Sequence, residues 1–395
     1  MRILQVHNRY RVRGGEDRVV DRTVALLRRR GHDVQVLGRD SRDIGPGLRS
    51  RVAAGLCGIY SPGIYRTACR MLANGRPDVV HVHSVYPLIS PSVLVACRRA
   101  GVPVVMTCHN LRLACPAGGG YGPAGGCDRC TRTGEHLCVL RNCRHRLAQS
   151  FAYALRGFVA RKMGWFRDCV TTFISPSRFV VDRLTRAGFE ARRFAVVPHA
   201  VPIPEQAAEA QTGSYAAFAG RLTLQKGRVV LLEAAAGCPE VPVRVAGDWG
   251  DDRRLIAAAP SNVRLVGVLD QAALAEFYRR ARFLVMPSIC PESFGLVATE
   301  AMAFGLPVVA SAVGALPELV EDGVTGLLVE PGNAAELSHK MRRLWQDAGL
   351  CAQLGRAARR KAVQDYAEDV HYDRLMGVYR TAVKLRRAAA GAKRC

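Results

Sequence analysis

Short apolar runs and longer amphipathic stretches alternate along the first half of the chain. Apolar runs of strand length occur at residues 3–6, 33–37, 78–83 and 103–108. A helix-like stretch from Glu16 to Arg30 separates the first two runs. This βαβα order predicts a parallel sheet that is covered by helices on both faces.

The same pattern begins again at Tyr215. Strand-like runs follow at residues 215–220, 241–247, 262–267, 283–288 and 307–311, and long helical segments come after them. The pattern predicts an α/β protein with two doubly wound, Rossmann-like domains that face each other across a cleft. We expect the first domain at residues 1–197 and the second at residues 215–366.

The segments outside these two domains differ in character. Residues 198–214 are rich in Pro and small polar residues, which predicts an interdomain linker. Residues 367–395 begin with apolar residues at helical spacing and end in a basic tail. We expect this last helix to pack back toward the first domain.

Composition adds a strong positive charge to this picture. The 395 residues carry a formal net charge of +24 at pH 7, which favours an anionic partner: nucleic acid, a membrane surface or a phosphate-bearing substrate. Most of the charge is arginine scattered along the chain, which argues against nucleic acid. No apolar stretch is long enough to span a membrane, and the first residues have the pattern of a strand. We therefore expect a cytoplasmic protein, either soluble or peripheral on the inner face of the membrane.

The stretch PESFGLVATEAMAFGLPVV, residues 291–309, follows one of the predicted strands. Its pattern predicts a helix from Phe294 to Phe304 that ends at a glycine. The amides at a helix N-terminus bind phosphate, because they have unpaired donors and lie at the positive end of the helix dipole. Here these amides belong to Phe294, Gly295 and Leu296.

Two glutamates flank this predicted phosphate site. Glu300 lies within the helix, where its carboxylate would accept hydrogen bonds from the hydroxyls of a ribose. Glu292 precedes the helix and would contact a second sugar across the phosphates. In the structural alternative, Glu292 caps the helix and Glu300 makes a buried hydrogen bond.

The stretch FAGRLTLQKG, residues 218–227, adds two cations to the same domain. Gly220 ends a strand, Arg221 follows it, and Lys226 precedes the next helix. Cations at a strand-to-helix turn neutralise a diphosphate and its developing charge. Two solvated surface cations are the alternative.

These motifs resemble, in their order, those of the retaining glycosyltransferases of family 4, which have the GT-B fold. The motifs are Gly220-Arg221-Leu222, Lys226-Gly227, Gly247-Asp248, Gly267, Pro287-Ser288, Glu292-Ser293-Phe294-Gly295, Glu300-Ala301-Met302 and Gly305-Leu306-Pro307-Val308. Glu292 and Glu300 resemble the E-x7-E motif of that family. The resemblance covers almost the whole second domain.

The resemblance implies a role for each matching residue. Arg221 and Lys226 would hold the donor diphosphate, helped by the helix amides. Glu292 would contact the transferred sugar, Glu300 the ribose, and Val268 would lie beside the nucleobase. Such enzymes need no metal or other cofactor for catalysis, and the leaving phosphate takes the proton of the acceptor.

The first domain matches the family more loosely. Gly14 and Gly15 precede Glu16 at the start of a helix, which resembles the family's glycine loop that touches the donor phosphate and the acceptor. His109 ends a strand where the family places a histidine near the donor sugar. We expect His109 to donate a hydrogen bond to the sugar or to the leaving phosphate. The alternatives are an ordinary turn and a structural histidine.

Five cysteines cluster in a Gly-rich insertion at residues 115–143. Cys127 and Cys130 have the C-x-x-C spacing of a structural zinc site, which would stabilise a loop with few apolar residues. Cys115 and Cys143 would complete the site, with Cys138 as an alternative to the last. Reduced cysteines in a mobile acceptor loop are the other interpretation.

Residues 144–167 mix arginines and aromatic residues at helical spacing. Such a helix packs its aromatic face on a core or lies on an anionic membrane, near a lipid-linked acceptor. The sequence leaves both alternatives open.

The sequence thus predicts an enzyme that transfers a sugar from a nucleoside diphosphate sugar to an acceptor hydroxyl with retention of anomeric configuration. The acceptor is expected to be a glycan or a lipid-linked saccharide of cell-surface polysaccharide or glycolipid synthesis. A basic nucleic-acid-binding protein with a zinc module and a sugar-nucleotide epimerase of the same fold are the alternatives.

Overall fold

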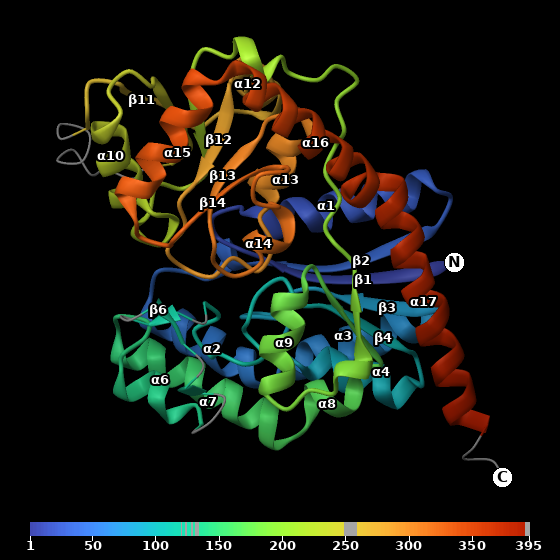
Figure 1. Cartoon of the computed structure of the whole chain (residues 1–395). Coiled ribbons are helices and arrows are strands. Elements are labelled where there is room, and N and C mark those ends of the chain that lie inside the picture. Colours follow the sequence, from blue (N-terminus) through green and yellow to red (C-terminus); the bar gives the residue numbers. More distant parts are fainter. Residues whose placement is uncertain (120, 123–124, 128, 131–133, 249–258, 392–395) are drawn as a thin grey trace. The chain divides into compact units, whose positions relative to one another are not determined.

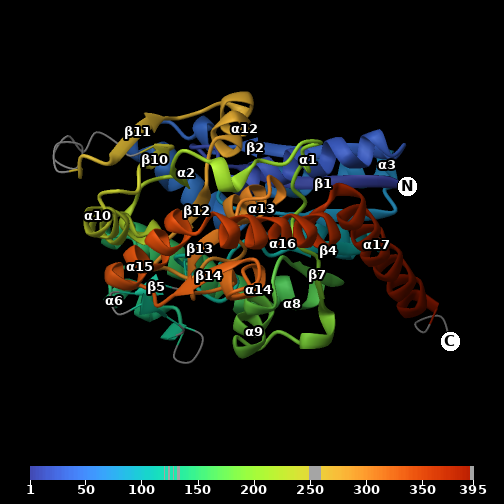
Figure 2. The ribbon, with the colours of Figure 1, turned by 45° about the horizontal axis from the view of Figure 1, so that its top comes forward.

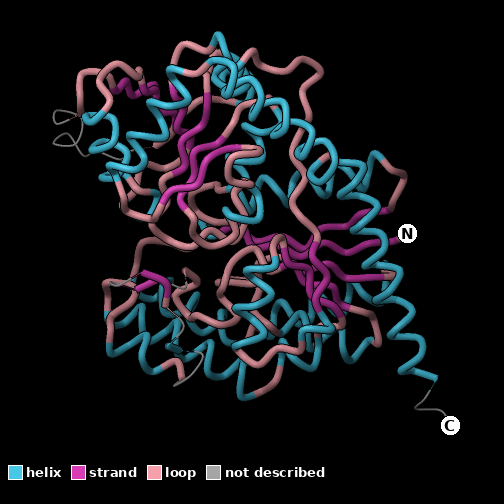
Figure 3. Tube along the Cα trace, in the orientation of Figure 1, coloured by secondary structure: helices cyan, strands magenta, loops and turns pink. Residues whose placement is uncertain are grey.

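The structure is a computed structural model that describes residues 1–119, 121–122, 125–127, 129–130, 134–248 and 259–391. The chain divides into two compact units: Met1–Pro198 with His371–Cys395 form unit 1, and His199–Val370 form unit 2. In each unit the strands lie side by side, with helices beside them (Figure 3). This arrangement confirms the predicted α/β class with two Rossmann-like domains.

Unit 1 is built on a parallel six-stranded sheet with the order β2-β1-β3-β4-β7-β8 (Figure 1). The strands are β1 (Arg2–Arg9), β2 (Asp33–Asp40), β3 (Val79–Val82), β4 (Val104–Thr107), β7 (Thr172–Ser175) and β8 (Phe194–Val196). The helices are α1 (Gly15–Arg29), α2 (Leu48–Ile59), α3 (Pro62–Gly75), α4 (Ser92–Ala100), α6 (His136–Leu140), α7 (Leu147–Lys162), α8 (Trp165–Cys169) and α9 (Arg178–Arg186). A hairpin of β5 (Tyr121–Gly122) and β6 (Gly125–Gly126) lies in the cysteine-rich insertion. The central strands β3 and β4 are buried at every position, as expected for a sheet between two helical layers.

Unit 2 contains a second parallel sheet, with the order β11-β10-β9-β12-β13-β14. Its strands are β9 (Ala216–Ala219), β10 (Val243–Ala246), β11 (Val263–Gly267), β12 (Phe283–Met286), β13 (Val308–Ser311) and β14 (Gly326–Val329). Its helices are α10 (Arg228–Gly237), α12 (Gln271–Arg279), α13 (Leu296–Ala303), α14 (Leu316–Leu319), α15 (Ala334–Gln346) and α16 (Ala348–Tyr366). Helices α13 and α16 pack against each other (Figure 2). This strand order is that of a Rossmann sheet.

The last helix, α17 (Glu368–Gly391), belongs to unit 1 from His371 onward. Leu375, Met376 and Tyr379 are buried in one apolar cluster with Ile3 of β1 and Val79 of β3. The chain therefore returns to its first domain, and apolar residues about one helical turn apart hold it there.

The helix expected at Phe294–Phe304 begins two residues later, at Leu296. Gly295 has a φ of 141°, which is outside the helical region and is favourable only for glycine. Within the described ranges, every helix is too short or too polar to cross a lipid bilayer.

Candidate functional site

Three glycines lie at the carboxyl ends of neighbouring strands in unit 2. Gly220 follows β9, Gly247 follows β10, and Gly267 ends β11. The amide of Gly247 donates to the carbonyl of Gly267 at 2.7 Å, and a Cβ on Gly247 would collide with the carbonyl of Gly220. From β9 the chain continues to β10 and β11 on one side of this strand, and it then crosses to β12 on the other side. Such a switch point at the carboxyl edge is where α/β sheets bind ligands.

Lys226 and Glu292 form an ion pair beside this switch point. Lys226 Nζ lies 2.5 Å from Glu292 Oε1, and Ser288 Oγ donates to the same oxygen at 2.7 Å. The Lys226 side chain is 35% exposed and that of Glu292 is 17% exposed. An entering anion can therefore reach the lysine, and a hydroxyl group can reach the glutamate.

The loop that carries Glu292 is held from two sides. The amide of Ile289 donates to the carbonyl of Gln225 at 3.1 Å, which ties this loop to the one that carries Lys226. On the other side, the carbonyl of Glu292 accepts from the amide of Ala315 at 2.8 Å, and Glu292 pairs with Gly314 as an isolated bridge. These backbone contacts position Glu292 without help from its own side chain.

Helix α13 begins next to this loop. The first amides of a helix have no partner within it, and the first turn of α13 contains no acidic residue that would compete for an anion. Glu300 lies on the same helix and is only 6% exposed. Arg221, after β9, and Val268, after β11, are both exposed, the latter by 77%. The unit 2 residues predicted to bind the donor thus lie at or near one edge of the unit 2 sheet, whereas Gly14, Gly15 and His109 belong to unit 1.

In unit 1, a polar network joins the start of α1 to the loop after β4. Glu16 Oε2 accepts hydrogen bonds from the Tyr10 hydroxyl at 2.9 Å and from Asn110 Nδ2 at 3.3 Å. Arg112 Nη1 donates to the same Tyr10 hydroxyl at 2.9 Å. Removal from water raises the pKa of Glu16, and the positive charge of Arg112 opposes this rise. Glu16 is therefore held in place by two side chains, Tyr10 and Asn110, and Arg112 holds Tyr10 in turn.

The glycines that precede Glu16 leave the beginning of α1 open. Gly15 is the first residue of the helix, and Gly14 is exposed. A Cβ on Gly14 would meet no atom within 4 Å, and its φ of −126° is open to any residue. The fold of unit 1 does not itself require glycine at this position, which agrees with a loop that a ligand approaches.

His109 belongs to a second, buried network. His83 Nε2 lies 2.8 Å from Gln5 Oε1, which can only accept, so His83 carries its proton on Nε2. The other ring nitrogen, His83 Nδ1, lies 2.9 Å from His109 Nε2 and accepts from it. Burial lowers the pKa of His109 to about 3, with a further contribution from His7, so the ring is neutral near pH 7. Its Nδ1 atom then has no proton, which favours acceptance of a hydroxyl hydrogen in place of the donation expected from the sequence.

Acid is expected to destabilise unit 1 because of this histidine. The pKa of His109 is lowered in the folded state, so the unfolded state binds the proton first, below its own pKa of about 6.5. The contribution of His109 to the free energy of unfolding is fully present above pH 6.5 and is lost as the pH falls from about 6.5 toward 3. We expect a loss of about 2 kcal/mol at pH 5 from this residue alone. Urea unfolding at pH 7.5 and pH 5 measures it.

Two variants separate His109 from other acid effects. His109→Gln should make the dependence of stability on pH shallower by about that amount. His145→Gln removes an exposed histidine of the same unit and serves as the control. If stability changes equally with pH in wild type and in His109→Gln, the acid effect does not come from His109.

The five cysteines of the insertion come together in unit 1. Each of Cys115, Cys127, Cys138 and Cys143 raises the pKa of Cys130, after the larger effect of burial. However, no set of three His, Cys, Asp or Glu side chains is arranged to hold a metal ion in the part of the chain that the structure describes. The zinc site stays a prediction from the sequence.

Several residues that position the site were not predicted from the sequence. In unit 2 these are Ser288, which donates a hydrogen bond to Glu292, and Gly314, which pairs with Glu292. In unit 1 they are Gln5, His83 and Arg112. A signal for His83 exists, because His81 and His83 alternate with valines in a strand that is otherwise apolar. Buried polar positions in such a strand require partners.

Two protein-family models match this chain. The one described as "Glycosyltransferase Family 4" matches residues 13–203, and the one described as "Glycosyl transferases group 1" matches residues 202–361. A D-inositol 3-phosphate glycosyltransferase of Acidothermus cellulolyticus is 31% identical over 430 aligned residues, which cover 95% of this chain and 88% of that protein. The chain therefore belongs to glycosyltransferase family 4 and has the GT-B fold.

Further comparisons agree with this assignment. A D-inositol 3-phosphate glycosyltransferase of Mycobacterium sp. strain KMS is 41% identical over 143 residues, a match that spans 32% of this chain and 31% of that protein. A phosphatidyl-myo-inositol mannosyltransferase of Mycobacterium leprae is 28% identical over 94% of both chains. The fold is similar to that of sucrose-phosphate synthase from Thermosynechococcus elongatus (TM-score 0.71, 20% identity, 96% and 98% of the chains). It is also similar to Anabaena HepE in complex with UDP (TM-score 0.66, 19% identity, 96% and 100%). None of these matches supports the nucleic-acid-binding or epimerase alternative.

Proposed function

We propose that this glycosyltransferase moves a sugar from a nucleoside diphosphate sugar to a hydroxyl group of its acceptor, with retention at the anomeric carbon. The observation that carries the proposal is the Lys226–Glu292 ion pair beside the N-terminus of α13. A lysine together with open helix amides stabilises the negative charge that develops on a leaving diphosphate. The HepE structure, whose complexes contain UDP and UDP-glucose, supports this class of donor.

In the proposed reaction, the acceptor oxygen forms a bond to the anomeric carbon while the bond from that carbon to the diphosphate breaks. The diphosphate leaves and takes the proton of the acceptor hydroxyl. Attack from the face that the diphosphate leaves retains the configuration. Lys226, Arg221 and the amides of Phe294, Gly295 and Leu296 hold the departing charge, so that we propose no metal or other cofactor for the chemistry.

The remaining residues bind and orient the sugars. In unit 2, Glu292 accepts hydrogen bonds from hydroxyls of the transferred sugar. In unit 1, the Nδ1 atom of His109 accepts a hydrogen bond from a sugar hydroxyl. Glu300 accepts from the ribose, and the exposed Val268 lies against the base. Glu16 contributes to the acceptor side. Carboxylates are suited to these roles because each oxygen accepts more than one hydrogen bond.

We propose that the acceptor belongs to glycolipid or cell-surface polysaccharide synthesis. The names of the relatives support this class, since one acts on phosphatidyl-myo-inositol and others on D-inositol 3-phosphate. The exposed face of α7 supports an acceptor at a membrane. Leu147, Phe151, Leu155 and Phe158 are exposed at spacings of four, four and three residues, so they share one face of the helix.

Contact of α7 with anionic lipid is testable. Arg146 and Lys162, at the two ends of α7, are exposed, so basic groups accompany the apolar face. Replacing Phe151 and Phe158 together with serine should lower co-sedimentation with anionic vesicles by about tenfold or more, because two aromatic side chains that would enter the lipid are lost. The exposed Val363 of α16 in unit 2 offers a matched control, Val363→Ser. Equal binding by the double variant and wild type would refute the contact.

A thermal-shift screen tests the donor. We expect one of UDP, GDP, ADP or their sugar conjugates to raise the melting temperature of the metal-free protein by about 5–10 °C at 100 times its Kd. In Glu300→Ala the shift should shrink or vanish, because the ribose loses its acceptor. Glu233→Ala removes an exposed glutamate of α10 and should keep the full shift. A folded protein that responds to none of these nucleotides would refute the proposed function.

We also keep a structural zinc ion in the insertion as a proposal. The donors would be Cys115, Cys127, Cys130 and either Cys143 or Cys138, which the fold brings near one another. Four thiolates suit zinc, and binding would stabilise the insertion rather than take part in transfer. Metal analysis of the purified chain, which should contain about one zinc ion per chain if the site exists, would decide this point.

A further inference from the structure

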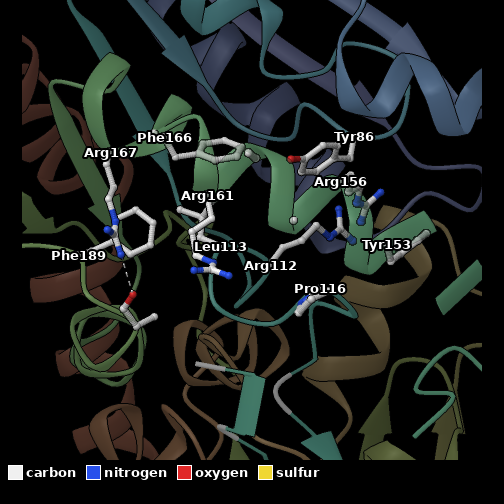
Figure 4. Close-up of a pocket in the computed structure, with 14 residues that line it drawn as sticks. Tyr86, Arg112, Leu113, Pro116, Tyr153, Arg156, Arg161, Phe166, Arg167 and Phe189 are labelled. Atoms are coloured by element: carbon white, nitrogen blue, oxygen red, sulfur yellow. Dashed lines mark hydrogen bonds between the residues drawn. The ribbon is translucent and has the colours of Figure 1, made fainter. Parts of the chain in front are cut away.

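A pocket in unit 1 contains four arginines and is lined by α7, the loop after β4 and the segments around α8 (Figure 4). Its cavity volume is about 40 Å³. Arg112 and Arg156 lie close to Tyr86 and Tyr153, and Arg167 lies at the other end (Figure 4). A concave site lined by several cations is suited to a small anionic group.

The two outer arginines have partners within the protein. Arg161 makes two hydrogen bonds to the carboxylate of Glu135, at 2.7 and 2.6 Å. Arg167 is exposed and donates to the carbonyl of Ala187 at 3.4 Å. Their presence at the pocket is therefore explained without a ligand.

Arg156 is different. It is 6% exposed, and its guanidinium lies over the rings of Tyr153 and Tyr86, with distances of 3.7 and 4.2 Å to the ring centroids. Its Nη2 atom has no hydrogen-bond partner, and none of the described groups that shift the pKa of Arg156 is a carboxylate. The tyrosine rings orient the cation and attract it, but they do not neutralise its charge.

Arg112 adds a second cation to the same place. Its Nη1 atom donates to Tyr10, while its Nε atom is buried without a partner. Burial lowers the pKa of Arg156, and the like charge of Arg112 lowers it further. Glu16 raises the pKa of Arg112, but no carboxylate in the described part of the chain does so for Arg156. A buried cation without a counter-ion is costly and the two arginines repel each other, so an anion between them would offset both effects.

We propose that Arg112 and Arg156 form an anion subsite that binds the phosphate group of the acceptor. Guanidinium groups bind phosphate by paired, charge-assisted hydrogen bonds, for which the unpartnered Nε and Nη2 atoms supply donors. The inference rests on the proposed function, and it adds that the acceptor is a phosphate ester.

The position of the subsite connects it with the groups proposed to act in transfer. Tyr86, Arg112 and Leu113 line this pocket and also line a second pocket, whose other residues include Glu16 and His109. An acceptor with its phosphate on the arginines therefore extends its hydroxyl groups toward Glu16 and His109. The anion thus fixes the orientation of the acceptor within unit 1.

Calorimetric titration with small phosphates tests the subsite. Because Lys226 is itself expected to bind phosphate, all titrations use the full chain with Lys226→Ala. We expect inorganic phosphate and glycerol 1-phosphate to bind, the ester at least as tightly, and glycerol not to bind. Arg156→Gln should weaken both phosphates at least tenfold, Arg156→Lys less so, and the matched control Arg161→Gln less than twofold.

Each other outcome overturns a defined part of the proposal. Equal phosphate binding by Arg156→Gln and its parent refutes the subsite. So does the absence of phosphate binding in a folded parent. Loss of binding in both Arg156→Gln and Arg161→Gln also refutes it. If inorganic phosphate binds but glycerol 1-phosphate does not, the phosphate group bound at the subsite does not belong to the acceptor. Nucleotide thermal shifts, measured with Lys226 intact, should be the same in wild type and Arg156→Gln. If wild type shows no nucleotide thermal shift, the proposed function is refuted, whatever the phosphate titrations show.

Discussion

Lys226→Ala is expected to lower kcat for sugar transfer by about 10²–10³-fold, the usual effect of removing one group that stabilises developing negative charge. Lys226 Nζ lies 2.5 Å from Glu292 and is partly exposed beside the N-terminus of α13, where the diphosphate is proposed to leave. Its loss should affect kcat more than KM, since the charge on the diphosphate grows as the bond breaks. Steady-state kinetics with the donor found in the thermal-shift screen would measure both constants.

A second ion pair of unit 2 provides the control for Lys226. Lys361 Nζ lies 3.7 Å from Asp365 on α16, and its exposure of 26% is similar. Lys361→Ala should leave kcat within about twofold, because exposed pairs contribute little to stability. If both variants lose the same activity, general destabilisation is the cause. If neither loses activity, Lys226 does not stabilise the leaving group.

Gly314→Ala is expected to destabilise unit 2 by about 3 kcal/mol and to raise the KM for the donor. Gly314 has a φ of 64°, and a Cβ there would collide with the backbone N and O of Glu292. The left-handed conformation costs a side chain about 1 kcal/mol, and overpacking against backbone adds about 1–3 kcal/mol. The loop can relieve the collision only by moving Glu292. Urea unfolding and donor kinetics would measure the two effects.

Gly323→Ala separates the backbone conformation from the collision. Gly323 has a similar φ of 74°, but a Cβ there would meet nothing within 4 Å. We expect this variant to lose about 1 kcal/mol and to keep the donor KM. Equal effects of the two substitutions would show that conformational strain alone acts, and that the Glu292 loop is not held by Gly314.

The residues that we propose for the donor side could be selected from the sequence because they lie in short motifs. Lys226, Glu292 and Glu300 each stand at a fixed offset from a strand or a glycine, and an offset along the chain is a local property. The two sheets were predictable for the same reason, since apolar runs report which segments are buried. The strands β7, β8 and β14 were not among the predicted runs, and α13 begins later than predicted, at Gly295, where a positive φ delays the helix.

The amino-acid sequence by itself therefore determined the fold class, the family and the residues that we propose to face a nucleotide sugar. Tertiary structure alone decided which other residues hold these side chains in position. Gln5 meets His83 across 78 positions, Gly314 supports Glu292, and Arg156 meets Tyr86 from a different element. Such contacts depend on how the strands and helices pack, which no periodicity or spacing records. The unpaired charge of Arg156 is visible only when every neighbour has been placed, because burial and pairing are properties of the whole environment of a side chain.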